Sequence, residues 1–238
     1  MRLKNVLIFS CFLLIASGCK KEPSLSFSEI HISVPKNNIV DINIPKAQGH
    51  EKVSGQINAE IEKLVISALH IDDIDNPATS VKEGIKRFNT DYISFKTDFP
   101  ESIQVWEAQI DGEILYQSDE IISISITSYV NTGGAHGSLH ISFLNFEAES
   151  GHLIPNEKLF NNLMAFNKIA KPYFQKSVSD KDLALDINTF NLPKNISYNE
   201  DGVVLLYNAY EIAPYLSGIT EFLIPFNEVE SLLVFNSL

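Results

Sequence analysis

The chain has 238 residues, of which 45% are hydrophobic, and its formal net charge at pH 7 is −12. This length and composition are sufficient for one or two domains that each bury a hydrophobic core. The negative charge disfavours contact with nucleic-acid phosphates and with anionic lipid, so we expect no nucleic-acid partner. The same acidity is compatible with a cationic protein partner, although it is also common among well-solvated secreted domains.

The first 18 residues have the features of a secretory signal peptide. Arg2 and Lys4 supply a positive start, and residues 6–15 form an apolar run that is too short for a resident membrane-spanning helix. Small residues end this run just before Cys19, which resembles a bacterial lipoprotein signal. The resemblance implies that segment 1–18 is removed and that the Cys19 thiol is acylated. An ordinary secretory signal with an incidental cysteine is the alternative.

We therefore expect a protein of the cell envelope that is held on a membrane only by acyl chains such as palmitate at Cys19, with residues 19–26 as a tether. Lys20 stands where the sorting rule of lipoproteins would place an aspartate for inner-membrane retention, which favours the outer membrane in a cell that has one. The other cysteine, Cys11, lies in the signal, so the mature domain has no thiol for a disulfide or a metal site. Loss of the two basic signal residues changes the net charge from −12 to −14.

The N-terminal half begins with strands and continues with helices. Alternating apolar residues predict strands over 26–35 and 39–44. Apolar residues spaced by three and four predict an amphipathic helix over 53–69. A second helix is predicted to begin after Ser80, because Glu83 completes a capping box, and to stop before Pro100.

After Pro100 the apolar period changes to two, which indicates strands. Residues 104–117 are predicted to form two short strands around the turn pair Asp111-Gly112. The remaining predicted elements are strands over 120–129 and 138–147, a helix over 159–174, a hairpin that turns at 200–202, a strand over 219–224 and a helix over 226–234.

These elements predict an α+β fold. Two amphipathic helices lie among the N-terminal strands, and a mid-chain helix and a short C-terminal helix accompany the later ones. The sheet is expected to be mostly antiparallel, because most connections are as short as hairpins. We expect two α+β subdomains, over residues 27–126 and 127–238.

Residues 129–155 contain three of the six histidines, His136, His140 and His152. On a strand the first two lie on one face but about 13 Å apart, which is too far to share a zinc ion. They could meet only if the turn extended as far as Ser138. We therefore expect no metal site and no cofactor. Ser138 also lacks the sequence pattern of a nucleophile elbow, so no catalytic residue is assigned.

A turn accounts better for this stretch. Gly133 and Gly134 are free to adopt positive φ between two strong strands. His136 at such a bend can bond a turn carbonyl through one ring nitrogen and act as a structural clamp. A residue at an exposed loop tip can also bind a ligand, so all three are candidate binding residues.

A second candidate segment, YEIAPY, begins at Tyr210. Glu211 is an acid placed among aromatic residues and is a candidate binding contact, together with Tyr210 and Tyr215. The alternative is that both tyrosines pack and bond through their hydroxyls. We expect Trp106, the only tryptophan, to pack in the core rather than to hold a sugar.

These blocks together resemble a known family. The features are Tyr129, the TGGAHG run at 132–137, Asn145-Phe146 and the segment 150–160, followed by the block that begins at Tyr210. They are similar to the extracytoplasmic domain shared by RsiV-type lysozyme-sensing anti-sigma factors and by the non-catalytic N-terminal region of PdaC-type peptidoglycan deacetylases. The resemblance implies an α+β fold, an envelope location and, as in the anti-sigma members, lysozyme binding. The sequence shows neither a sigma-binding segment nor a deacetylase domain, so we expect neither of those activities.

The favoured function is an envelope lipoprotein that binds a protein, such as a cationic lysozyme, or a cell-wall ligand such as peptidoglycan, without catalysis. Whether the protein is an enzyme stays open. The first alternative is an enzyme directed at peptidoglycan, a hydrolase or deacetylase-like, in which His136 and Glu211 meet across the fold. The second alternative is a structural or assembly lipoprotein.

Overall fold

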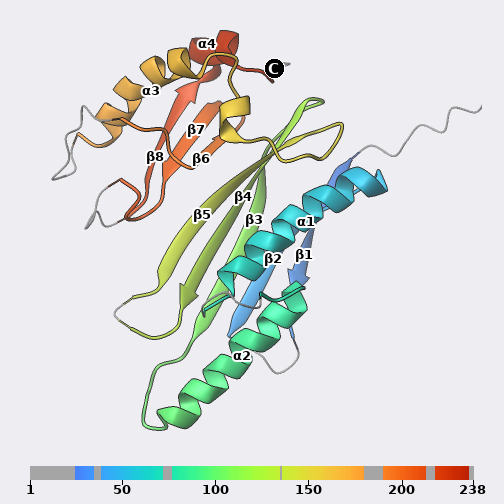
Figure 1. The fold of residues 1–238 in the computed structure, drawn as a ribbon, viewed down its shortest axis with the longest axis vertical. Helices are drawn as coiled ribbons and strands as arrows, with labels where there is room; N and C mark the ends of the chain where they lie inside the picture. Colours follow the sequence, from blue (N-terminus) through green and yellow to red (C-terminus); the bar gives the residue numbers. More distant parts are fainter. Residues whose placement is uncertain are drawn as a thin grey trace, which may run out of the picture.

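The computed structural model describes residues 25–34, 39–71, 77–134, 136–179, 190–212 and 218–235. A five-stranded sheet carries two helices on one face, and a three-stranded sheet with two further helices lies at one end of it (Figure 1). The α+β fold class predicted from the sequence is confirmed. The predicted signal peptide and Cys19 lie outside the described residues.

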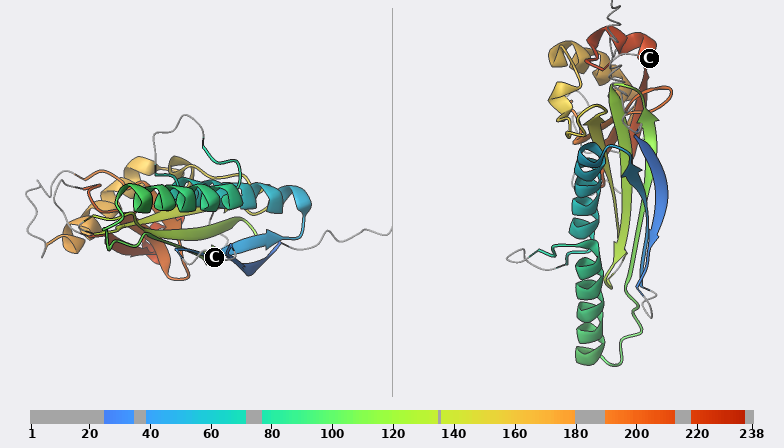
Figure 2. Two further views of the ribbon diagram at one scale, coloured as in Figure 1. Left: turned by 90° about the horizontal axis from the view of Figure 1, so that it is seen from below. Right: turned by 90° about the vertical axis from the view of Figure 1, so that its right-hand side faces the viewer.

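The larger sheet has the order β1-β2-β3-β4-β5. Its strands are Ser26–Ile32, Val40–Gln48, Glu107–Gln117, Ile121–Asn131 and Ser138–Glu147. Neighbouring strands are antiparallel except for β2 and β3, which run parallel. Helices α1 (Glu51–Ala68) and α2 (Val81–Asp98) connect that parallel pair and follow one another along the same face of the sheet (Figure 2).

Both helices form where the apolar spacing predicts them. The buried side chains of α1 include Val53, Ile57 and Ile61, which recur every four residues and pack on the sheet. At the start of α2 the hydroxyl of Ser80 accepts a hydrogen bond from the Glu83 N–H at 3.3 Å. This is the predicted N-cap, which satisfies one of the free N–H groups at the helix start.

The predicted turn at Asp111-Gly112 is wrong, because β3 runs unbroken from Glu107 to Gln117. A side chain at Gly112 would place its Cβ 2.6 Å from Pro45 and 2.8 Å from Ile126 on the flanking strands. The glycine is therefore needed for the close approach of neighbouring strands and not for a reversal of the chain.

The smaller sheet is formed by β6 (Asn195–Tyr198), β7 (Gly202–Tyr207) and β8 (Thr220–Pro225) in that order. The predicted hairpin between β6 and β7 is confirmed. The side-chain oxygen of Asn199 accepts from the N–H groups of Asp201 and Gly202, both at 2.9 Å. Such an Asx-type arrangement stabilises a tight turn.

Two helices cover this smaller sheet. Helix α3 (Leu163–Ser177) begins four residues later than predicted, because a 3₁₀ turn, η1 (Asn156–Lys158), precedes it and Phe160 pairs with Leu233 in an isolated bridge. The predicted C-terminal helix consists of α4 (Phe226–Val229) and the 3₁₀ turn η2 (Glu230–Leu232). Asn162 caps α3 by accepting from the Ala165 N–H at 3.0 Å.

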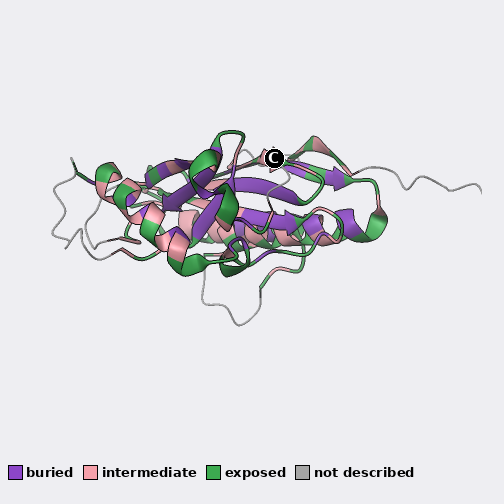
Figure 3. Ribbon diagram, turned by 90° about the horizontal axis from the view of Figure 1, so that it is seen from above, coloured by how far each residue is buried: buried purple, intermediate pink, exposed green. Residues whose placement is uncertain are grey.

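The protein has two hydrophobic cores. One lies between the five-stranded sheet and helices α1 and α2, and the other lies between the three-stranded sheet and α3. Buried residues run through the strands, whereas the outward helix surfaces are exposed (Figure 3). Trp106 is buried in the first core with its ring 5.7 Å from that of Phe88, as predicted.

The division expected between residues 126 and 127 falls within β4, and the assignment of subdomains stays a prediction. Ile121 at the start of β4 packs in the second core, whereas Ile122 packs in the first, so this strand contributes to both. None of the helices over the described residues combines the length and the apolar character needed to cross a membrane.

Candidate ligand groove between the two sheets

The glycine–histidine stretch forms the turn between β4 and β5. Gly133 and Gly134 have φ values of 90° and 130°, the positive values for which glycine is suited. The Gly133 N–H donates to the side-chain oxygen of Asn131 at 3.0 Å. A Cβ at Gly137 would lie 2.5 Å from ring atoms of Tyr129. The Tyr129 ring therefore packs directly on the backbone of Gly137, where any side chain would collide with it.

His136 is exposed at this turn, with Nδ1 3.0 Å from the carbonyl oxygen of Gly137. The nitrogen donates this hydrogen bond, which is the geometry expected of a turn clamp. His136 does not line the groove described below, whereas Thr132 and Ser138 at the two ends of the turn do.

A groove runs along β5 from this turn to the smaller sheet. Its first part, about 470 Å³, lies between β4, β5 and the C-terminal end of α1. Its second part, also about 470 Å³, lies between β5, α1 and residues 208–211. The two parts share Leu64, His140 and Ser142 and therefore lie next to one another.

Polar side chains of β5 form the floor of the groove, because alternate residues of a strand point to the same face of the sheet. Ser138, His140 and Ser142 lie at every second position of β5 and so on one face of the sheet. Ser128 pairs with His140 across β4 and β5, and its hydroxyl donates to the His140 carbonyl oxygen at 3.3 Å. The floor therefore presents hydroxyls around one exposed imidazole.

Tyr210 lies on the rim at the other end of the groove. Its side chain is 62% exposed, and its φ of 67° is the only positive value among the described non-glycine residues. A bulky residue in this backbone region costs free energy and persists only where the surroundings hold it. Strain of this kind is frequent at ligand sites.

The carboxylate of Glu211 helps to fix the backbone around Tyr210. One oxygen accepts from the Lys194 N–H at 2.8 Å and the other from the Asn208 N–H at 2.9 Å. The Glu211 N–H in turn donates to the Asn208 carbonyl oxygen at 3.1 Å. Glu211 thus closes the segment 208–211 and ties it to the start of β6. Burial, and secondarily the charge of Glu211, raise the pKa of the neighbouring Tyr207 above its usual value.

Asparagine side chains join the smaller sheet to the edge of β5. Asn208 accepts from the Ile141 N–H and donates to the Ile141 carbonyl oxygen, both at 2.8 Å. Asn195 accepts from the Phe143 N–H at 2.9 Å. These amides replace the neighbouring strand that β5 lacks on this side, and they fix the width of the groove.

The structure therefore brings together some of the predicted site residues. Tyr210 and Glu211 line the groove, and Gly133, Gly134 and His136 form the turn beyond its opposite end. Glu211 and His136 do not share the groove. Tyr215 lies outside the described residues.

Sequence reasoning did not assign His140 or His70 to a binding site. His140 could have been found from its phase with Ser138 and Ser142, but His70 reaches the groove only through the packing of α1. Its Nε2 is buried and bonded by no described residue.

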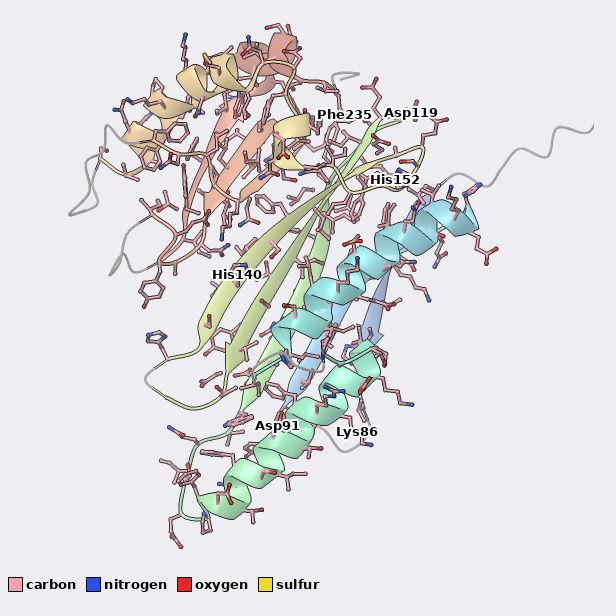
Figure 4. The ribbon with its side chains drawn as sticks, in the orientation of Figure 1. Lys86, Asp91, Asp119, His140, His152 and Phe235 are labelled. Atoms are coloured by element: carbon pink, nitrogen blue, oxygen red, sulfur yellow. The ribbon has the colours of Figure 1, made fainter. Side chains whose placement is uncertain are left out.

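No group of three or more metal-ligating side chains occurs within the described ranges. His140 and His152, which the sequence places twelve residues apart, lie well separated along β5 and the loop that follows it (Figure 4). These two histidines therefore do not form one site.

Two family models match the sequence. One, described as deacetylase PdaC, covers residues 32–139, and the other, a family of unknown function termed DUF3298, covers residues 155–227. The chain combines a PdaC domain with a DUF3298 domain. The resemblance to PdaC-type proteins stated from the sequence is confirmed. No curated protein matches the chain.

Two solved DUF3298 structures have the same fold. The protein from Pseudomonas aeruginosa PAO1 is 19% identical, with a TM-score of 0.59 over 90% of this chain and 95% of that one. The protein from Bacteroides fragilis NCTC 9343 is also 19% identical, with a TM-score of 0.62 over 90% of this chain and 96% of that one. At this identity the likeness concerns the fold alone.

The groove lies where the PdaC and DUF3298 domains meet. Its α1 and β4 walls belong to the PdaC domain, and residues 194–211 belong to the DUF3298 domain. Residues 140–144 of β5, at its centre, fall between the two matched ranges. A ligand in the groove would therefore contact both domains.

Proposed function

We propose that this PdaC–DUF3298 protein is a binding module of the cell envelope, without catalysis, that takes a cell-wall ligand or a protein such as lysozyme at the groove. The proposal rests on one observation, the exposed position of the Tyr210 ring beside the groove. An exposed aromatic ring, held in a strained backbone by Glu211, stands at the rim of a groove lined with hydroxyls. Tyrosine rings are common anchors in binding sites because they combine an apolar face with a polar tip.

The test compares the wild-type protein with Tyr210→Gly in a peptidoglycan sedimentation assay and a lysozyme pull-down. Glycine accepts the positive φ of this position, so the ring is removed without backbone strain. Phe99→Ala is the control, because Phe99 is similarly exposed but lies at the far end of α2. We expect Tyr210→Gly to weaken binding at least about tenfold, the magnitude typical of an anchor residue.

Retention of binding in Tyr210→Gly would place the ligand elsewhere. If the wild-type protein binds neither peptidoglycan nor lysozyme, the proposed binding function is wrong and a structural or assembly role is favoured.

The net charge of the whole chain, as distinct from the lining of the groove, is compatible with a cationic protein ligand. The expected mature chain carries −14, so attraction to lysozyme should be seen mainly in the association rate. Exposed charges are screened beyond about 8 Å at physiological ionic strength, so association should slow strongly as salt is raised. A neutral sugar ligand would show almost no such dependence. On-rates measured over a salt series separate the two.

The proposed location rests on the lipoprotein signal. Replacement of Cys19 by Ser removes the acylation site, and we expect the protein to leave the membrane fraction. A variant that stays with membranes after a high-salt wash would contradict the lipid anchor.

A further inference from the structure

The groove differs in charge from the rest of this acidic protein. The chain has 30 Asp and Glu residues against 18 Lys and Arg residues. Among the residues that line the groove, the only carboxylate is that of Glu211, and both of its oxygens accept backbone N–H groups. The described lining therefore offers a ligand no carboxylate that is not already bonded.

The other ionisable groups of the lining can donate hydrogen bonds. Lys194 is exposed, and the ion pairs found among the described residues do not include it. His140 is exposed at the centre of the floor, between Ser138 and Ser142. The Lys194 ammonium bonded to a carboxylate makes a stronger hydrogen bond than two neutral groups do, and an N–H of the His140 ring can donate beside it. The repulsion of a bound carboxylate by distant surface carboxylates is screened by salt.

The shape of the groove favours an extended ligand. It follows β5 from Ser138 to Leu144, which is roughly 20 Å at about 3.3 Å per residue. An extended peptide of about five or six residues has this length. The lining contains apolar side chains, such as Leu64 and Ile126, as well as hydroxyls. A peptide ligand has methyl groups that can contact the former and amide groups that can bond the latter.

We infer that the groove binds a short extended peptide with a free carboxylate, the chemistry of the stem peptides of a bacterial cell wall, and that Lys194 and His140 receive the carboxylate. The inference rests on the proposed function and specifies its ligand class.

The test is calorimetric titration of the purified protein with an N-acetylated wall pentapeptide that ends in a free carboxylate, and with the same peptide as its C-terminal amide. We expect the amide to bind at least about tenfold more weakly, because a charged hydrogen bond is lost. Lys194→Gln should weaken binding of the free acid and reduce its preference over the amide, because only His140 is then left to receive the carboxylate. Lys176→Gln, on the exposed surface of α3, is the control and should change neither affinity.

Equal affinities for acid and amide, or an unchanged affinity in Lys194→Gln, would overturn the inference. Glycan strands stripped of peptide form a third arm, and their binding with the affinity of intact wall fragments would assign the ligand to the sugar instead. If the pentapeptide fails to bind while peptidoglycan or lysozyme still binds through Tyr210, only this inference falls. If none of them binds, the proposed function falls with it.

Discussion

The side-chain amide of Asn208 forms both of the hydrogen bonds that a neighbouring strand would make with Ile141. Its oxygen accepts from the Ile141 N–H and its nitrogen donates to the Ile141 carbonyl, each at 2.8 Å. Asn208 is itself 6% exposed. One side chain thus both holds the smaller sheet on the larger one and protects part of the edge of β5.

Asn208→Ala should lower the free energy of unfolding by about 1–3 kcal/mol, because two hydrogen bonds are lost and two backbone groups are left without partners. Urea denaturation measures the change. Asn161→Ala is the matched control, since Asn161 donates a single hydrogen bond to Ser231 on the exposed surface. An equal effect of the two changes would show that Asn208 contributes nothing specific to the junction.

Gly137→Ala should destabilise the β4–β5 turn by about 1–3 kcal/mol, because the new methyl group would lie against the Tyr129 ring. Gly55→Ala on α1 is the control of opposite sign. Nothing lies within 4 Å of its added Cβ, and alanine favours a helix more than glycine does. Combining Gly137→Ala with Tyr129→Ala should relieve the clash, so the double mutant is expected to cost less than the sum of the single changes.

His136→Ala should lower stability by only about 0.5 kcal/mol, because its hydrogen bond to Gly137 is exposed to water. We expect ligand affinity to stay unchanged, since His136 does not line the groove. Thermal melting and the sedimentation assay report the two quantities separately. Loss of binding at an unchanged melting temperature would instead make His136 a binding residue.

Glu83 should make stability depend on pH in the acid range. Its carboxylate accepts from the Thr79 N–H and hydroxyl at 2.8 Å each and from Arg87 at 2.6 Å. The Thr79 N–H first, then the Thr79 hydroxyl and Arg87, lower the pKa of Glu83 from 4.5 to about 2. Because the folded pKa lies below the unfolded one, the stabilisation is present above pH 4.5 and is lost as the pH falls towards 2. In Glu83→Gln the urea midpoint should depend less on pH between 4.5 and 2 than it does in the wild type. An unchanged pH dependence would show that Glu83 does not cause it.

Glu221 should have the opposite effect. Partial burial of its carboxyl on β8, and then the charge of Glu113, raise its pKa above 4.5. A raised folded pKa stabilises the fold below the unfolded pKa, and this stabilisation is lost as the pH rises through the folded value. Glu221→Gln should therefore raise the urea midpoint at pH 7 and change it little at pH 4. Glu230→Gln, at an exposed carboxylate, is the control and should not reproduce this difference between the two pH values.

Local signals predicted most of the elements. The Ser80–Glu83 cap and the apolar spacing of α1 depend on residues within one or two turns, so the sequence alone places both helices. Gly112 misled the prediction, because aspartate–glycine pairs favour hairpins, whereas this glycine makes room for Pro45 and Ile126. That need arises from residues far away in the chain and has no local signal.

The groove could be predicted only in parts. The TGGAHG turn and the segment that begins at Tyr210 stood out, yet the meaning of Glu211 did not, because its role is to bond the backbone of Lys194. His140 and Leu64 line the same groove only because α1 packs on the face of the sheet that His140 shares. Their proximity depends on how α1 packs on the five-stranded sheet, which residue spacing does not encode.

The parallel pairing of β2 and β3 has a consequence for the order of folding. Asn43 and Asp111, bonded across these strands at 3.2 Å, are 68 residues apart in the chain. Closing so long a loop costs more entropy than closing the short turn between β4 and β5. We therefore expect the β3–β4–β5 meander to form first and the segment from β1 to α2 to dock on it later. Until that docking, the backbone N–H and C=O groups on the β2 side of β3 have no partner strand. A nascent chain is therefore most prone to pair wrongly with another strand at β3.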